Sequence, residues 1–334
     1  MSSDADTPVF ALTLPAGCTV QGLAERLGGR VLVGGNEARG AGPIPVATVA
    51  AAEFADVGSL TVVFRGAAIA QLRSPSAVLV EPQLAGRVTD RVCWVHDNGR
   101  WALAQLLERF VVPTRLDLSE RIGQGVFRGA NSTLEPGCEI ADDVRIGAGA
   151  VILSGAQLGA GTIVEPRAVI YGCCRIGRRV HIGAGAVIGR AGFGWVTSPQ
   201  GALVRMPQLG GVIVEDDVEV GALATVDAGT LAPTRLRSGC KLDAHVHVGH
   251  NVVIGRATMV AAQAGFAGSA SVGDGVLVGG QAGVADHVHV GDRARVAGGA
   301  GVIGNVRASR TVAGYPAVER MRWLRAMARL MERK

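Results

Sequence analysis

Aliphatic residues recur at every sixth position through the middle of the chain. From Leu134 the series runs to Ile188 without a polar member, and it ends at Val302. The count slips by two residues across 190–211 and by four more before Leu236. A period of six fits neither an amphipathic helix nor a strand with two different faces. It predicts a β-solenoid in which each hexad contributes one short strand and one corner.

Small residues accompany the aliphatic residue at two positions of the hexad. Gly often follows it directly, as at Gly147 and Gly183, and Ala often stands four places after it, as at Ala150 and Ala186. We expect the aliphatic side chain to point inward and the Ala to fit where the interior narrows. We expect the Gly to form the corner, because its backbone tolerates conformations that other residues avoid.

This repeat resembles that of the hexapeptide-repeat acyltransferases. The resemblance implies a mainly β fold, a left-handed parallel β-helix with three hexads in each coil. Residues one coil apart would then stack about 4.8 Å from each other.

Other patterns flank the repeat. Residues 1–112 mix helical and strand spacings, which predicts a small α/β domain. The solenoid is expected over 113–312, with an excursion loop over 190–211 that carries a hairpin, and 313–334 is expected to hold a helix. In the first domain, the expected helices are Val20–Leu27, 50–56 and 98–110, and the expected strands are 28–35, 59–64, 76–80 and 91–95.

The expected C-terminal helix, from about Ala317 to Arg333, has two different stripes. Its apolar stripe contains Val318, Met321, Leu324, Ala328 and Met331, and its basic stripe contains Arg322, Arg325, Arg329 and Arg333. The basic stripe has two interpretations. It is either a solvated face whose charge suits a helix C-terminus, or a docking surface for an acidic partner.

Composition and charge limit the kind of core, the partner and the localisation that we expect. Hydrophobic residues make up 48% of the chain but aromatic residues only 4%, which suits a solenoid core with little room for rings. The net charge of +5 is modest, and a sequence pI near 9.1 indicates an acidic partner without identifying one. We expect no nucleic-acid partner. Residues 1–7 are polar and acidic, and no apolar run is long enough to span a bilayer. We therefore expect a cytoplasmic protein with no membrane span.

The six cysteines show no metal-binding or redox spacing. Cys138, Cys174 and Cys240 take the small inward position of their hexads, which favours buried free thiols in a reducing compartment. We expect no metal and no bound cofactor.

Candidate chemistry is densest in residues 241–255, where His245, His247 and His250 lie close together. Val248 belongs to the inward series, so His250 should lie near a corner and face outward. His287 lies two coils and one residue later, so the two histidines should share a face about 10 Å apart. Asp227 and Asp243 are nearby candidates to orient an imidazole. A zinc site built from the three clustered histidines lacks a matching Cys or carboxylate group. Surface histidines without a role remain a further interpretation.

Four segments carry a closer resemblance: 241–255, 225–227, the Gly192-Phe193-Gly194 loop with 206–208, and the N-terminal region 46–82. They resemble the UDP-3-O-(3-hydroxyacyl)glucosamine N-acyltransferases of lipid A biosynthesis, over almost the whole chain and in the same order. The resemblance implies that His250 is the catalytic base and His287 a second active-site histidine. It implies substrate contacts from Asp227, Asp243, Phe193 and Asn251. It further implies a homotrimer, an acyl carrier protein thioester as donor, and uridine binding by the first domain.

The chemistry fits these residue types. An amine must lose a proton as it attacks a thioester carbonyl, and a neutral imidazole is a suitable base near neutral pH. A backbone N–H group or His287 would stabilise the oxyanion. Because no Ser or Cys nucleophile is required, we expect direct transfer rather than an acyl-enzyme.

The chain departs from the family pattern at the acceptor. Ala191 replaces the Asp of the family's Asp-Gly-Phe-Gly, and Ala228 replaces the Arg of its Asp-Arg-Gly. Val62, Arg65 and Ala68 stand where the family holds uracil with Phe, Asn and Tyr, so the aromatic face is missing. Three hypotheses stay open: the family's N-acyltransferase, an acyltransferase for a different amino sugar, and a non-catalytic solenoid that binds or scaffolds.

Overall fold

The fold was taken from a computed structural model that describes residues 12–38, 42–111, 119 and 121–332. The chain divides into two compact units. Unit 1 contains Met1–Arg115, Phe193–Leu209 and Thr230–Ala232, and unit 2 contains the remaining segments, Leu116–Gly192, Gly210–Gly229 and Pro233–Lys334. The hairpin predicted within 190–211 therefore groups with the first part of the chain.

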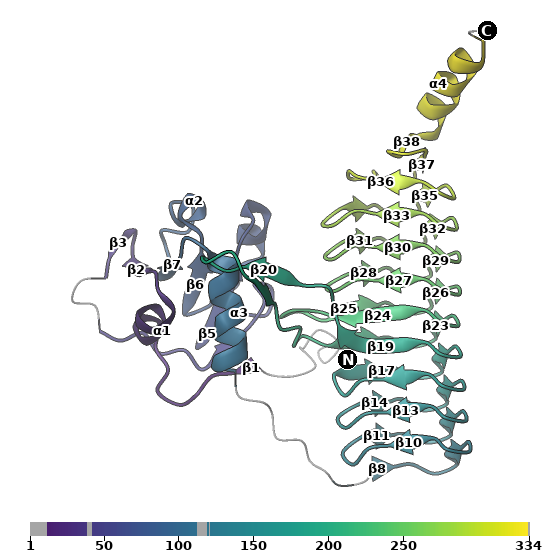
Figure 1. The fold of residues 1–334 in the computed structure, drawn as a ribbon, viewed down its shortest axis with the longest axis horizontal. Coiled ribbons are helices and arrows are strands. Elements are labelled where there is room, and N and C mark those ends of the chain that lie inside the picture. Colours follow the sequence, from purple (N-terminus) through teal and green to yellow (C-terminus); the bar gives the residue numbers. More distant parts are fainter. Residues whose placement is uncertain (1–11, 39–41, 112–118, 120, 333–334) are drawn as a thin grey trace. The chain divides into compact units, whose positions relative to one another are not determined.

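Unit 1 is built on one mixed β-sheet. Its strands are β1 (Leu12–Thr13), β2 (Arg30–Val33), β3 (Asn36–Glu37), β4 (Thr48–Val49), β5 (Ser59–Val63), β6 (Ala77–Val80) and β7 (Cys93–Val95). Its helices are α1 (Val20–Leu27), the 3₁₀-helix η1 (Gly66–Gln71), α2 (Pro82–Ala85) and α3 (Gly99–Arg109). The order is β1-β4-β5-β6-β7-β2-β3, with parallel pairs from β4 to β7 (Figure 1).

The alternation of side chains in these strands gives unit 1 a core on each face of the sheet. Leu60, Leu79 and Trp94 face α1, α3 and the hairpin strands β20 (Trp195–Thr197) and β21 (Leu203–Arg205). Val78 and Val95 face the opposite way, toward α2 and η1. The hairpin joins this core through Met206, and Asn98 Nδ2 donates to Thr197 O at 2.8 Å.

The sequence predicted most of unit 1 correctly. The expected elements at Val20–Leu27, 59–64, 76–80, 91–95 and 98–110 are confirmed as α1, β5, β6, β7 and α3, and 28–35 contains β2. The helix expected over 50–56 is wrong. Ala50 N still bonds to the sheet through Leu60 O, and only a single turn follows, closed by Phe54 N to Ala51 O. Because the N–H of Ala50 is hydrogen-bonded to β5, the backbone there stays extended and cannot start a helix.

Unit 2 is a parallel β-solenoid with three sheets. Sheet 1 contains β8 (Arg121–Ile122), β11 (Glu139–Ile140), β14 (Gln157–Leu158), β17 (Cys174–Ile176), β22 (Val212–Val214), β25 (Thr234–Leu236), β28 (Val253–Ile254), β31 (Ser271–Val272) and β34 (His289–Val290). Sheet 2 contains β9 (Phe127–Arg128), β12 (Arg145–Ile146), β15 (Ile163–Val164), β18 (His181–Ile182), β23 (Glu219–Val220), β26 (Lys241–Leu242), β29 (Met259–Val260), β32 (Leu277–Val278), β35 (Arg295–Val296), β37 (Thr311–Ala313) and β38 (Val318–Glu319). Sheet 3 contains β10 (Thr133–Leu134), β13 (Val151–Ile152), β16 (Val169–Ile170), β19 (Val187–Ala191), β24 (Thr225–Ala228), β27 (His247–Val248), β30 (Gly265–Phe266), β33 (Gly283–Val284) and β36 (Gly301–Val302).

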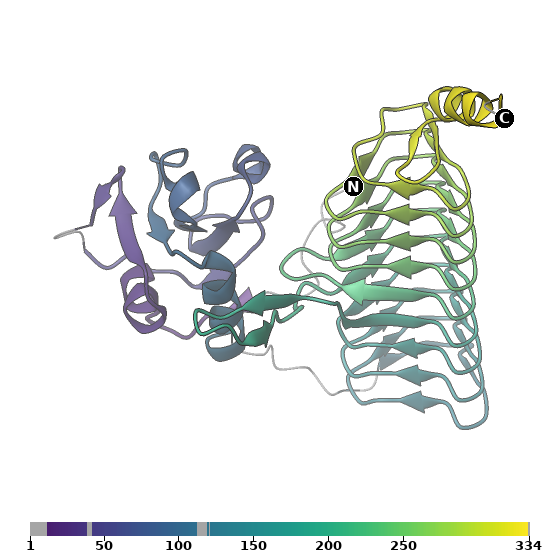
Figure 2. The ribbon, with the colours of Figure 1, turned by 45° about the horizontal axis from the view of Figure 1, so that its top comes forward.

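Each coil visits sheets 1, 2 and 3 in turn, and we call the corners after them edges A, B and C. Figure 2 shows the strands of successive coils lying one above another. The predicted period is confirmed: Glu139 pairs with Gln157, which pairs with Arg175, and the second residue of each short strand points inward. Both slips in the count are loops at edge C, between β19 and β22 and between β24 and β25.

The corner residue is not the Gly that the sequence suggested. The residue with positive φ is the third after the inward aliphatic, for example Asp143 at 58° and His245 at 59°. The Gly directly after the aliphatic is required for a different reason. A Cβ at Gly147 or Gly183 would lie 2.5 Å from a backbone nitrogen of the next coil. The coils therefore pack too closely for a side chain at that position.

The solenoid interior is filled as expected. Cys138, Cys174 and Cys240 are buried free thiols, and burial raises the pKa of Cys240 to about 12. Each fully buried aliphatic side chain contributes about 1.5–3 kcal/mol. Phe266 is the large aromatic residue of this core.

After the last coil, β37 pairs with β38, and α4 (Arg320–Glu332) follows (Figure 1). The helix begins later than predicted because Val318 and Glu319 belong to β38. No side chain of α4 is buried, so its apolar stripe is uncovered within one chain; Arg333 lies outside the described residues. Within the described ranges, none of the helices has both the length and the apolar composition needed to span a membrane.

Candidate functional site

Edge C carries the side chains that are best suited to catalysis. His250 lies at this edge, two residues after β27, and is half-buried. Its Nδ1 lies 3.1 Å from Asn251 Oδ1. Because an amide oxygen can only accept, Nδ1 carries the proton of a neutral imidazole. Nε2 then keeps its lone pair and can act as a base.

The ring of His250 lies across the next coil at Gly268. A Cβ at Gly268 would lie 2.6 Å from His250 Cε1 and even closer to Nε2. Asn251 is held in turn, since its backbone N–H donates to Thr234 Oγ1 at 2.8 Å and Thr234 is buried. Asn251 takes the corner conformation, with φ of 61°, which Asn tolerates better than most residues. The imidazole is therefore oriented by its neighbour in sequence and by its neighbour one coil away.

A buried carboxylate lies beside this histidine. Asp227 is 1% exposed, and Arg190 Nε approaches its Oδ1 at 2.9 Å while Nη2 lies 3.3 Å from Oδ2. Although Nε is close, it does not complete a hydrogen bond with Oδ1. Burial raises the pKa of Asp227, and the opposing attraction of Arg190, His247 and His250 does not cancel that effect. A Cβ at Gly192 would touch both Asp227 and His250, which shows how closely the two approach.

His247 completes the cluster on the outer face of sheet 3. Its Nδ1 lies 2.7 Å from Thr225 Oγ1, and its Nε2 lies 3.9 Å from Asp227 Oδ2. Asp227 is thus surrounded by three nitrogen-bearing side chains: Arg190, His247 and His250.

A β-bulge brings Arg190 to Asp227. Ile188 pairs with Val226, but the register then shifts, so that Arg190 pairs with Asp227 and Ala191 with Ala228. Gly189 makes the bulge with φ of 91°. The Cys173 and Cys174 thiols donate to Gly189 O and Ile188 O, at 3.2 and 3.4 Å.

The other predicted site residues lie at several places. His287 and Asp286 are exposed at edge C, two coils beyond His250, so the shared edge is confirmed while the role of His287 stays a prediction. Phe193 is 82% exposed and groups with unit 1. In unit 1, Val62 and Ala68 are half-buried against the two cores, and Arg65 is exposed.

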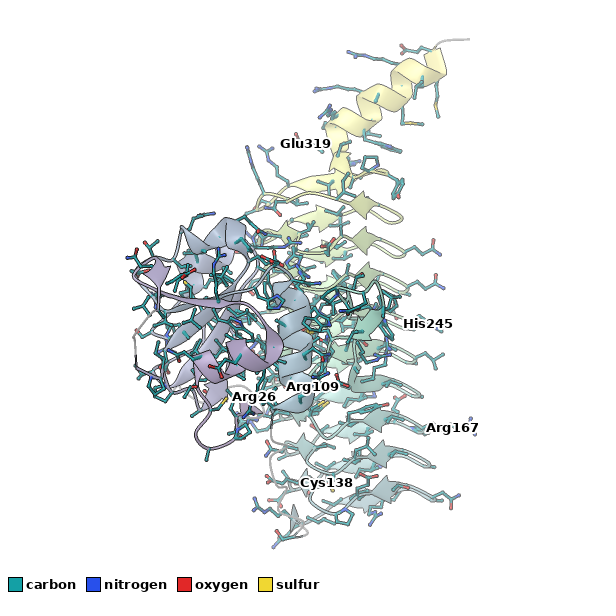
Figure 3. All side chains as sticks on the ribbon, turned by 60° about the vertical axis from the view of Figure 1, so that its left-hand side comes forward. Arg26, Arg109, Cys138, Arg167, His245 and Glu319 are labelled. Atoms are coloured by element: carbon teal, nitrogen blue, oxygen red, sulfur yellow. The ribbon has the colours of Figure 1, made fainter. Side chains whose placement is uncertain are left out.

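Asp243 does not lie beside His250, contrary to the expectation that it would orient the imidazole. It follows β26 at edge B, where its carboxylate accepts the N–H groups of Ala244 and Ala262 at 2.7 and 3.2 Å. His250 lies seven positions further along the chain, after the next side of the coil. Figure 3 shows His245, from the same corner as Asp243, and Arg167 projecting outward from edge B.

The three clustered histidines, the alternative considered for a zinc site, lie at different places in the fold. Across the residues that the structure describes, no three His, Cys, Asp or Glu side chains gather closely enough to hold a metal ion. His245 is at edge B, His247 on sheet 3 and His250 at edge C. The three histidines follow one another around a coil, so their side chains point in different directions and do not meet.

The sequence analysis missed Arg190 and Thr225, and it considered His247 only as a zinc ligand. The period pairs Ile188 with Val226 and would pair Arg190 with Ala228. Only the bulge moves Arg190 to the carboxylate. One feature of the sequence could have indicated Arg190. It directly precedes Ala191, the position at which this chain lacks the Asp of the family pattern.

Comparisons with known proteins agree with this architecture. The bacterial transferase hexapeptide family matches residues 121–154 and 155–190, and the hexapeptide repeat of succinyl-transferase matches 269–303. Two solved structures show the same left-handed β-helix. A UDP-N-acetylglucosamine acyltransferase from Campylobacter jejuni has a TM-score of 0.52 at 23% identity, covering 58% of this chain and 74% of that one. The Francisella novicida enzyme has a TM-score of 0.51 at 22% identity, covering 59% and 71%.

Sequence relatives confirm the closer resemblance. A UDP-3-O-acylglucosamine N-acyltransferase from Anaeromyxobacter dehalogenans is 44% identical over 207 residues, which cover 60% of this chain and 55% of the relative. One from Wolinella succinogenes is 39% identical over 168 residues, which cover 50% and 53%. The chain thus spans about half the length of these relatives.

Proposed function

We propose that this hexapeptide-repeat relative of the UDP-3-O-acylglucosamine N-acyltransferases is itself an N-acyltransferase. It would move a 3-hydroxyacyl group from an acyl carrier protein thioester to the amine of a UDP-3-O-acylglucosamine-type acceptor in lipid A biosynthesis. The observation that carries the proposal is His250, whose Nδ1 is held by Asn251 at 3.1 Å. Its unprotonated Nε2 lies at the edge that the similarity associates with catalysis.

The proposed reaction is direct. The amine attacks the thioester carbonyl, and His250 Nε2 takes a proton from the attacking nitrogen. The C–N bond forms, the tetrahedral oxyanion collapses, and the C–S bond breaks. The thiolate of the carrier's prosthetic arm then receives the proton from the imidazolium. His287 or a backbone N–H group of edge C would stabilise the oxyanion, and Phe193 and Asn251 would contact the acceptor.

The proposed assembly is a cytoplasmic homotrimer. The solenoid edge of one chain is open, so a neighbouring protomer would supply the second wall of the site. Asp243, at edge B, would reach His250 only from such a neighbour. The carrier protein would dock on Arg322, Arg325 and Arg329 of α4, which are exposed.

Removal of the base tests the function. In an assay with hydroxyacyl carrier protein and the UDP-3-O-acylglucosamine acceptor, His250→Gln should lower kcat by roughly 10²–10⁴-fold with little change in KM. Near-full turnover would contradict the assignment of His250.

A matched pair of glycine variants checks the orientation of the ring in the same assay. Gly268→Ala places a Cβ against the imidazole and should also lower kcat. Gly304→Ala, at the same corner position two coils further, has nothing within 4 Å and should not. Equal rates for the two variants would show that the ring position is irrelevant to turnover.

A second candidate is an acyltransferase for a different amino sugar. Ala191 and Ala228 remove the acceptor charges that the family pattern has, while Arg190 introduces a cation one residue earlier. Rates with a panel of amino-sugar acceptors would separate the two candidates.

A further inference from the structure

The carboxylate of Asp227 is shielded from solvent, while the hydrogen-bond donors around it, Arg190 and His247, are exposed. The carboxylate is 1% exposed, whereas the side chains of Arg190 and His247 are 42% and 44% exposed. The buried group therefore serves as an anchor, and the guanidinium is the surface that a ligand meets.

Arg190 retains donors for such a ligand. Nε and Nη2 face the carboxylate, and within the described residues these are its polar contacts. A guanidinium presents five N–H groups in a planar fork, so both N–H groups of Nη1 and the second N–H of Nη2 remain. A fork fixed by a buried carboxylate is suited to carboxylate or phosphate oxygens, which it binds in two parallel hydrogen bonds.

The cation lies beside two positions that depart from the family pattern. Positions 191 and 228 are cross-strand partners, and both are Ala, where the family pattern has Asp and Arg. The pair directly before them, Arg190 with Asp227, now carries the charge. Position 191 therefore has no carboxylate to bind a cationic group. Instead, the exposed guanidinium of Arg190 lies next to that position.

We propose that Arg190, held by Asp227, binds an anionic oxygen group on the acceptor and makes this chain selective for an acidic amino-sugar nucleotide. The proposal rests on the function proposed above for the identity of the acceptor. Two sources supply the same chemistry: a carboxylate on the sugar ring, and the diphosphate of the nucleotide.

Calorimetry without any acyl donor tests the proposal. The probes are UDP-glucosamine and UDP-2-amino-2-deoxyglucuronate, which differ by the ring carboxylate. A charge-assisted hydrogen bond contributes about 1.5–3 kcal/mol, so Arg190→Gln should weaken binding by about 10- to 100-fold. The matched control is Arg179→Gln. Arg179 holds Asp217 in a bidentate pair at 2.7 Å, but this pair lies at edge A.

Each result has one meaning. Loss confined to the uronate identifies the ring carboxylate and supports the selectivity. Equal loss for both probes identifies the diphosphate as the bound group and would overturn the selectivity. If Arg190→Gln binds both probes no more weakly than Arg179→Gln does, the pair is only structural and the proposal is wrong. Arg190-dependent binding without acyl transfer to either probe would contradict the proposed function alone.

A second variant covers the possibility that Arg190→Gln fails to fold because it leaves a buried carboxylate unpaired. The double variant Arg190→Gln with Asp227→Asn removes both charges. It should fold and should lose the same binding, whereas retained binding in the folded double variant would overturn the proposal.

Discussion

At the scale of single residues, His250 is oriented by partners that no single stretch of sequence contains. Asn251 sets the tautomer, Gly268 leaves room for the ring, and Thr234 holds the backbone of Asn251. Two of these three partners come from neighbouring coils. The histidine was predictable from its surroundings in sequence, but its proton position was not.

Asp227 is expected to destabilise the fold at neutral pH. Burial raises its pKa above the ordinary value of 3.8. At a pH between the ordinary and the raised pKa of Asp227, the folded state keeps a proton that the unfolded state has released. The free energy of unfolding therefore falls as pH rises. Asp227→Asn removes this effect. Urea unfolding should show the variant gaining stability relative to wild type between pH 4 and pH 7.

Asp217 is the control, with the opposite sign. Hydrogen bonds from Arg179 lower its pKa, so its contribution is lost as pH falls. Asp217→Asn should therefore lose stability relative to wild type as pH rises from the lowered pKa of Asp217 to its ordinary value of 3.8. If both variants change in the same direction, the unfavourable burial of Asp227 is not supported.

At the scale of elements, the bulge in β19 decides which side chains meet. Gly189 has a positive φ, and a Cβ there would lie 3.3 Å from the Cys173 sulfur and against the Cys174 sulfur. Backbone strain of about 1–2 kcal/mol and overpacking of about 1–3 kcal/mol should add. Gly189→Ala should thus lower the free energy of unfolding by about 2–5 kcal/mol in denaturant titration.

Gly201 is the matched control for this substitution. It has φ of 84° but nothing within 4 Å, so Gly201→Ala carries only the backbone strain. A loss of stability at Gly189 no larger than the loss at Gly201 would show that the thiols do not hold the bulge.

At the scale of the whole molecule, the proposed site needs a second wall. We expect a homotrimer, and sedimentation equilibrium should give three times the 34.2 kDa of one chain. A stable monomer at micromolar concentration would contradict this assembly, and with it a role for Asp243.

The same scale includes α4, which has no fully buried side chain in one chain. Arg322, Arg325 and Arg329 recur at three- and four-residue steps and share a face. Arg325→Glu with Arg329→Glu should raise KM for acyl carrier protein, with an effect that weakens in salt. The rate with a small pantetheine thioester should stay unchanged; an equal loss with both donors would make the stripe structural.

The hexad spacing was enough to predict the solenoid and the buried cysteines. The resemblance to the hexapeptide-repeat acyltransferases added the three hexads of each coil, and with them the shared edge of His250 and His287. It was enough because a repeat of six residues allows one inward side chain per strand. Spacing cannot predict where that repeat is locally broken. The bulge at Gly189, which the Cys173 and Cys174 thiols hold, moves Arg190 from Ala228 to Asp227. Likewise, proximity in sequence suggested Asp243 as a partner of His250, but the corner between them places the two residues on different edges of the solenoid. Contacts between coils join residues that are far apart in sequence, so only the folded chain decides which charges meet.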